Sequence, residues 1–115
     1  MTLHFNFILF CLLVSQAAGC KKAGPALPGC IEEKINAFKQ ESKHNPPAEV
    51  WIYSYHGKDV YFISEYCCDV PSQVLDDQCQ SLCSPGGGLT GKGDGKCPQF
   101  FKEATNGRRL WKDDR

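Results

Sequence analysis

The sequence lacks an excess of charge of either sign, and it lacks any apolar run long enough to cross a membrane. Its 115 residues carry 13 Lys and Arg against 13 Asp and Glu, so the formal net charge is zero. A protein that binds nucleic acid or an anionic membrane through its overall electric field needs a positive excess. We therefore expect no nucleic-acid partner, and the length allows one small domain.

The longest apolar run, FNFILFCLLV over residues 5–14, has ten residues, whereas a membrane-spanning helix needs about 20. A run of this length is typical of a signal peptide. Ala17-Ala18-Gly19-Cys20 follows it and resembles a bacterial lipobox, which implies acyl chains of the palmitate type on Cys20 and retention on a membrane. Plain secretion after cleavage near Ala18 is the alternative. No Lys or Arg precedes the run, which counts against both interpretations.

These features divide the chain into three parts. We predict a lipoprotein signal peptide over residues 1–19, then the lipidated Cys20 with a tether over residues 20–29, and one disulfide-rich domain over residues 30–115. The tether sequence KKAGPALPG holds two Pro and two Gly and has no apolar periodicity, as expected for a linker.

Cysteine is abundant, and its count predicts a disulfide framework in an oxidising compartment. The domain keeps six of the eight cysteines, an even number that makes three disulfides: Cys30, Cys67, Cys68, Cys79, Cys83 and Cys97. An exported chain favours disulfides over a zinc site. Adjacent cysteines rarely bond to each other, so we expect Cys67 and Cys68 to have different partners, and the remaining connectivity stays open.

Apolar spacing predicts an α+β fold. A helix is expected over residues 30–42, because Ile31, Ile35 and Phe38 form one stripe. A β-hairpin over about 49–64 follows, with its turn at His56-Gly57-Lys58. The rest is expected to form a short helix over 70–82, a helical turn or two over 98–105 closed by Asn106-Gly107, and an edge strand over 108–112. The small antiparallel sheet built on the hairpin would be cross-linked by the three disulfides.

Both faces of the expected hairpin carry large side chains. Trp51, Tyr53 and Tyr55 alternate with Val50 and Ile52, so one of these sets packs on the helix. The aromatic set is either a second layer of core or an exposed recognition surface, where Trp and Tyr are the usual anchors. These three residues are candidate recognition residues.

A glycine-rich segment, PGGGLTGKGDGK over residues 85–96, lies between Cys83 and Cys97. It copies much of a phosphate-binding loop, but Gly93 replaces the Ser or Thr that would bind Mg²⁺. Asp94 alone falls short of the several carboxylates of a calcium loop. We therefore predict neither cofactor nor metal, and a loop that acts by its geometry. A loop held at both ends would also suit recognition, through Thr90, Lys92 and Asp94.

The sequence offers no recognisable catalytic site. His44 and His56 are the histidines outside the predicted signal peptide, and neither lies near a nucleophile in a known setting. We interpret both as solvated positions, at a helix end and in a hairpin turn.

Two segments carry a resemblance. VWIYSYHGKDVYFISEYCCD over residues 50–69 and PGGGLTGKGDGKCPQFF over residues 85–101 resemble a family of small, uncharacterised lipoprotein domains in Bacteroidota. The resemblance extends over about residues 30–112, and its distinctive strings are CCD and TGKGDGKCP. It implies an extracytoplasmic lipoprotein and transfers no site residue. Lys21-Lys22 after the lipobox favours the periplasmic side.

The predicted function is a lipid-anchored binding or interaction module in the bacterial cell envelope, not an enzyme. Its expected partners are the membrane, through the lipid, and a protein or a glycan. One alternative is a protease inhibitor that presents the disulfide-braced glycine-rich loop. A small envelope enzyme would instead need a cleft with a carboxylate or His, and a purely structural envelope component is the remaining alternative. An exposed Trp51, Tyr53 and Tyr55 stripe would favour the binding module, and a protruding 85–96 loop the inhibitor.

Overall fold

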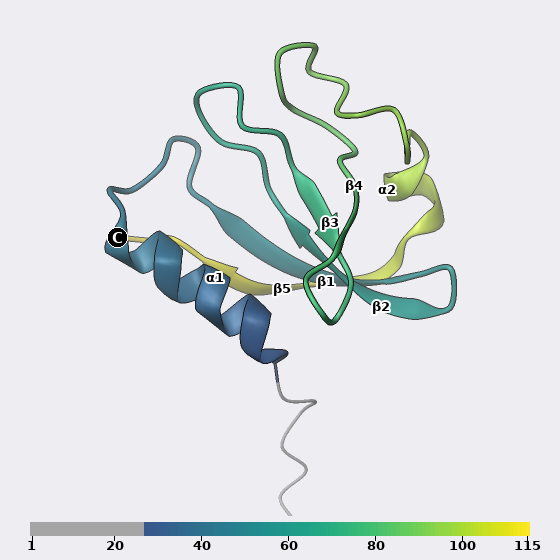
Figure 1. Cartoon of the computed structure of the whole chain (residues 1–115), viewed down its shortest axis with the longest axis horizontal. Helices are drawn as coiled ribbons and strands as arrows, with labels where there is room; N and C mark the ends of the chain where they lie inside the picture. The colour runs from purple at the N-terminus through teal and green to yellow at the C-terminus, as the bar shows by residue number, and fades with distance from the viewer. Residues whose placement is uncertain (1–26) are drawn as a thin grey trace, which may run out of the picture.

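The computed structural model describes residues 27–115, which form one antiparallel sheet with helices on both faces (Figure 1). The helices are α1 (Gly29–Gln40) and α2 (Phe100–Glu103). The strands are β1 (Glu49–Tyr55), β2 (Lys58–Ile63), β3 (Gln73–Leu75), β4 (Ser81–Cys83) and β5 (Thr105–Lys112). The spatial order is β4-β3-β2-β1-β5, and all neighbours are antiparallel. The predicted α+β class is confirmed.

The helix and the hairpin follow from their sequence patterns. Ile31 and Ile35 are the buried residues of α1, as their four-residue spacing predicts. The hairpin pairs Val50 with Ile63 and Tyr55 with Lys58. Its turn residues His56 and Gly57 have φ of 49° and 78°, the left-handed pair that a two-residue hairpin turn requires.

One face of the sheet packs against α1, and we call its buried residues the helix-side core. They are Ile31, Ile35, Val50, Tyr61, Ile63 and Leu75. Alternation along each strand sends every second side chain to this face. Cys30 and Cys79 border this core and are bonded to each other, which ties the start of α1 to the turn between β3 and β4.

The opposite face is covered by α2 and by the glycine-rich loop between β4 and α2, and we call its buried residues the loop-side core. They are Val60, Phe62, Val74, Cys83, Cys97 and Phe100. The Cys83–Cys97 disulfide closes the glycine-rich loop, and Figure 1 shows this loop rising from β4 and returning to α2.

The predicted helix over 70–82 is wrong, because this segment forms β3 and β4. Val74 and Leu75 are adjacent and both buried, one in each core, which is strand alternation and not helical spacing. The Asp76 carboxylate accepts the backbone N–H groups of Gln78 and Gln80 at 2.9 and 2.8 Å, which bends the chain into a turn. Pairing with β2 and this turn override the helical pattern.

The expectation that Cys67 and Cys68 have different partners is also wrong, since they are bonded to each other. The other two disulfides join residues whose Cα atoms are 6.0 Å apart, an ordinary separation. Because those four cysteines are held together by the packing around the two cores, the exposed Cys67 and Cys68 are left with each other. The predicted number of three disulfides is confirmed, and it indicates an oxidising, extracytoplasmic environment.

The C-terminal part needs a smaller correction. A helical turn forms where predicted, but α2 ends at Glu103, and Asn106-Gly107 lies inside β5 instead of closing the helix. Position 107 requires a glycine because a Cβ atom at this position would collide with the Tyr53 ring. The predicted strand over 108–112 is therefore longer than expected, and it is an edge strand as predicted.

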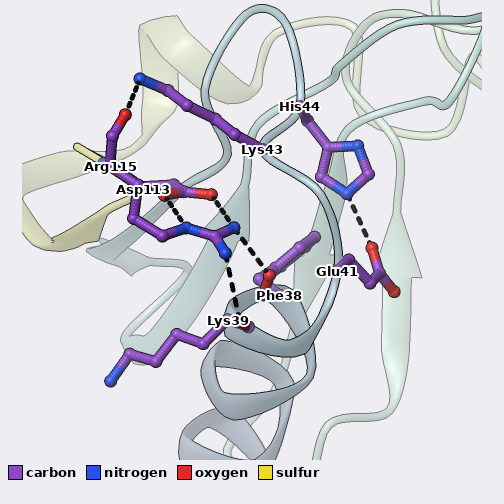
Figure 2. A network of polar contacts seen from close by, with 7 residues as sticks. All are labelled: Phe38, Lys39, Glu41, Lys43, His44, Asp113 and Arg115. Atoms are coloured by element: carbon purple, nitrogen blue, oxygen red, sulfur yellow. Dashed lines mark hydrogen bonds and ion pairs between the residues drawn. The ribbon is translucent and has the colours of Figure 1, made fainter.

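The C-terminal residues fasten the end of α1 to the sheet (Figure 2). Arg115 donates to both carboxylate oxygens of Asp113, at 2.8 and 2.7 Å, and to the carbonyls of Phe38 and Lys39 at 3.2 Å. Lys43 donates to the Arg115 carbonyl at 2.6 Å. Asp113 is only 1 % exposed, and the Arg115 guanidinium lowers its pKa to about 2. Asp113 therefore orients the Arg115 guanidinium, which donates to two carbonyls at the end of α1.

The predicted signal peptide, Cys20 and most of the tether lie outside the described residues. Among residues 27–115, no helix has the length and hydropathy of a membrane span.

Candidate functional site: an aromatic groove

A groove of about 420 Å³ lies on the loop side of the sheet, and we call it the aromatic groove. Phe62 and Phe101 supply its aromatic surface, and Pro46 and Pro47 also line it. Glu49, Glu65 and Lys112 add charged groups. The register explains this gathering, because Glu49 pairs with Lys112 across β1 and β5, and Trp51 pairs with Phe62 across β1 and β2.

Phe101 is the exposed aromatic residue of the groove. It is 59 % exposed, although its ring contacts those of Phe62 and Phe100 at centroid distances of 5.3 and 5.1 Å. Phe100 is fully buried in the loop-side core, so α2 is anchored by one phenylalanine and presents the next one to solvent. Exposed aromatic side chains held on a rigid base are typical of recognition surfaces.

Glu49 organises the polar side of the groove. Its carboxylate accepts a hydrogen bond from Trp51 Nε1 at 3.0 Å and one from Arg109 Nη1 at 3.3 Å, and Lys112 Nζ lies 3.9 Å away. The guanidinium of Arg109 also lies 6.0 Å from the centre of the Trp51 ring, within the range of a cation–π contact. These contacts fix the Trp51 ring and balance the Glu49 charge, and Glu49 remains 25 % exposed at its side chain.

The root of the glycine-rich loop completes the groove. Gly86 lines it and is held by Ser72, whose hydroxyl donates to the Gly86 carbonyl at 2.9 Å and accepts the Gly86 N–H at 3.0 Å. Ser72 is fully buried. The start of the loop is therefore held at a fixed position in the groove. The rest of the loop extends away from the sheet before it returns to α2 (Figure 1).

The three aromatic candidates from the hairpin are half-buried and border the loop-side core. Trp51 and Tyr53 stack on each other at 6.2 Å, and Tyr53 meets Phe101 at 6.4 Å. Burial, together with the Glu49 charge, raises the pKa of Tyr53. Tyr55 instead stacks on His56 at 3.9 Å. This face is thus mainly a second layer of core, and two of the three residues adjoin the groove.

The candidates in the glycine-rich loop lie apart from the groove lining. Thr90, Lys92 and Asp94 are exposed, and backbone hydrogen bonds fold the loop on itself, for example from Gly93 to Gly87 at 3.1 Å. The N–H of Lys96 lowers the pKa of Asp94. Within residues 27–115, no cluster of three or more metal-ligating side chains forms.

The two histidines have carboxylate neighbours. His56 Nε2 lies 2.7 Å from Glu103, and His44 Nε2 lies 2.7 Å from Glu41 (Figure 2). The His44 ring also packs on Tyr66 at 4.0 Å and is less solvated than its place after the helix predicts.

Sequence patterns miss several groove residues. Phe101, Glu49 and Lys112 come from three elements that only the register brings together. The adjacent Phe100 and Phe101 are the sequence feature that could have indicated Phe101. A one-turn helix cannot bury two adjacent phenylalanines on the same side, so one of them must lie at the surface.

One comparison with known proteins gives a match. A family model described as "Domain of unknown function (DUF6970)" covers residues 36–113. No curated protein and no solved structure matches the chain.

Proposed function

Because the chain belongs to the DUF6970 family, whose description names no activity, we propose its role from the aromatic groove. The proposal is an extracytoplasmic binding module that receives an apolar side chain of a protein partner between Phe101 and the Pro46-Pro47 wall. The single observation that carries this proposal is the 59 % exposure of Phe101 above a buried aromatic base. A buried phenylalanine side chain gains about 1.5–3 kcal/mol relative to an exposed one, so a partner that covers the 59 % exposed Phe101 recovers roughly half of this energy.

The charges around the groove support binding more than catalysis. The Glu49 carboxylate is engaged by the Trp51 indole and by Arg109, which leaves it as a positioning group. The groove thus has an apolar centre from Phe62 and Phe101 and a charged rim from Glu49, Glu65 and Lys112, the usual composition of a protein interface.

We further propose that the module is anchored by lipid on Cys20, on the periplasmic side of the envelope. The support comes from Ala17-Ala18-Gly19-Cys20 directly after the apolar run and from the disulfides of the domain. Intact-mass measurement of the membrane-bound protein should give a chain that begins at Cys20 and carries acyl groups. A chain without acyl groups that begins elsewhere would refute the anchor and leave the groove proposal standing.

The groove is tested by comparing two exposed apolar residues. Phe101→Ala should weaken capture of the partner from an envelope extract by at least about tenfold, the size of an interface hot spot. Leu89→Ala is the matched control, because Leu89 is 89 % exposed at the glycine-rich loop and lies outside the groove lining. Unchanged capture by Phe101→Ala would contradict the proposal, and competition by oligosaccharides would identify a glycan instead of a protein.

The exposure of Leu89 also favours the second candidate, a protease inhibitor that presents this loop. In that case Leu89→Ala abolishes inhibition of a protease panel, and Phe101→Ala has no effect. Because the loop has positive φ at Gly87, Gly88, Gly91, Gly93 and Gly95, its backbone turns back on itself. An inhibitor loop that pairs with a protease cleft presents extended backbone instead, so we favour the groove.

A further inference from the structure

A second and larger cavity, of about 860 Å³, lies at the other end of the hairpin. It is lined by residues of the β1–β2 turn, of the β3–β4 turn and by Pro28 at the start of α1. We call it the turn cavity. None of its lining residues is shared with the aromatic groove, so the function proposed above does not account for it.

Tyr61 is the residue that points to a ligand. Its side chain packs in the helix-side core and is only 7 % exposed, yet its hydroxyl has no hydrogen-bond partner within residues 27–115. Every fully buried polar side-chain atom of these residues does have a partner. The Tyr61 hydroxyl is therefore not fully buried, and Tyr61 lines the turn cavity. The rest of the side chain is buried, so a hydrogen-bond partner for this hydroxyl would have to come from a molecule in the cavity.

The charges of the cavity are mainly negative. Asp59 and Asp77 line it and form no ion pair within residues 27–115. Both carboxylates line the same cavity as Tyr61, and after burial itself they raise the pKa of its hydroxyl. The third lining carboxylate, Asp76, accepts backbone N–H groups of Gln78 and Gln80. Lys58 is the lysine of the lining, and His56 contacts Glu103.

The carboxylates are arranged for an organic cation and not for a metal ion. No three ligating side chains within residues 27–115 converge on one point, as a metal site would need. The negative groups are instead spread beside apolar surface from Tyr55, Val60 and the exposed Leu82. An aliphatic chain that ends in an ammonium group matches both features, because its stem packs on apolar surface while its head pairs with a carboxylate.

We propose that the turn cavity binds an aliphatic ammonium group. The ammonium donates hydrogen bonds to the Tyr61 hydroxyl and to the Asp59 and Asp77 carboxylates, and the aliphatic stem lies against Leu82. Two molecules could supply this ammonium group. One is a free linear amine, and the other is Lys22 of this chain, which precedes the cavity residue Pro28 by six residues, a reach of about 20 Å.

The test uses 1,5-diaminopentane as the probe and the purified full chain at pH 7. Titration followed by the NMR signals of the Leu82 methyl groups should show saturable binding. Asp59→Asn and Asp77→Asn should each weaken binding about fivefold, the effect of one ion pair. Tyr61→Phe removes only the hydroxyl and should weaken binding about threefold while the melting temperature stays the same. Asp114→Asn, an exposed carboxylate away from the cavity lining, is the control and should have no effect.

A second protein, Lys21→Gln/Lys22→Gln, distinguishes the two sources. If only this variant binds the probe, the chain's own lysine occupies the cavity in the parent protein. If both proteins bind it equally, the ligand is a free amine. The proposal is overturned if neither protein binds the probe at millimolar concentration, if 1-pentanol binds as well as the diamine, or if Asp114→Asn weakens binding as much as Asp77→Asn.

Discussion

The two faces of the sheet are covered by different kinds of side chain and by different parts of the chain. The helix-side core is mainly aliphatic and is closed by α1, which precedes the sheet in the sequence. The loop-side core is centred on Phe62 and Phe100 and is closed by a one-turn helix and a disulfide-bridged loop, which come from the far end of the chain.

The difference shows where the molecule is structural and where it has room for recognition. A three-turn helix covers its face with a continuous apolar stripe. The four-residue α2 buries one phenylalanine and leaves the next at the surface, so aromatic side chains remain half-exposed around it. The aromatic groove is the consequence of covering one face with a very short element.

The largest expected effect tests how far the loop side depends on one residue. Phe100→Ala should destabilise the protein by about 3–5 kcal/mol, because Phe100 is fully buried and its removal leaves a cavity. The adjacent Phe101→Ala should cost less than about 1 kcal/mol, since that ring is largely exposed. Urea unfolding measures both values. Similar losses of unfolding free energy for the two variants would mean that Phe101, like Phe100, mainly stabilises the fold and is not a free recognition residue.

A smaller effect separates two glycines of the bridged loop. Gly93 and Gly95 both have positive φ, which costs an alanine about 1 kcal/mol. A Cβ atom at Gly93 would in addition collide with the Ser84 carbonyl, whereas nothing lies within 4 Å at Gly95. Gly93→Ala should therefore destabilise the protein by about 3 kcal/mol, and Gly95→Ala should destabilise it by about 1 kcal/mol. Equal losses in calorimetry would show that the loop relaxes and does not hold the groove rigidly.

The smallest effect concerns the helix side at acid pH. The Asp113 pKa is lowered from 3.8 to about 2 by Arg115, so the folded state favours the ionised carboxylate. This contribution to stability is fully present above about pH 4 and is lost as the pH falls through about 2. Asp113→Asn removes it, so the stability difference between parent and variant should narrow between pH 4 and pH 2. A constant difference over this range would show that the Asp113–Arg115 pair does not stabilise α1.

The sequence alone determined the parts of the fold that depend on local patterns. The spacing of Ile31 and Ile35 specifies α1, and alternation around His56-Gly57 specifies the hairpin. The even number of cysteines predicts three disulfides. For the candidate site, alternation placed Trp51 and Tyr53 on one face, next to what became the groove.

Only the tertiary structure decided the rest, because it depends on partners far along the chain. The segment over 70–82 has helical spacing, yet it forms two three-residue strands, because β3 pairs with the edge of β2 and β4 pairs with β3. Cys67 and Cys68 bond to each other, and the other four cysteines pair beside the two cores. Phe101 meets Phe62, and Tyr61 lines the turn cavity, because of strand register and burial. Periodicity over a few residues carries no information about which distant residues will share a surface.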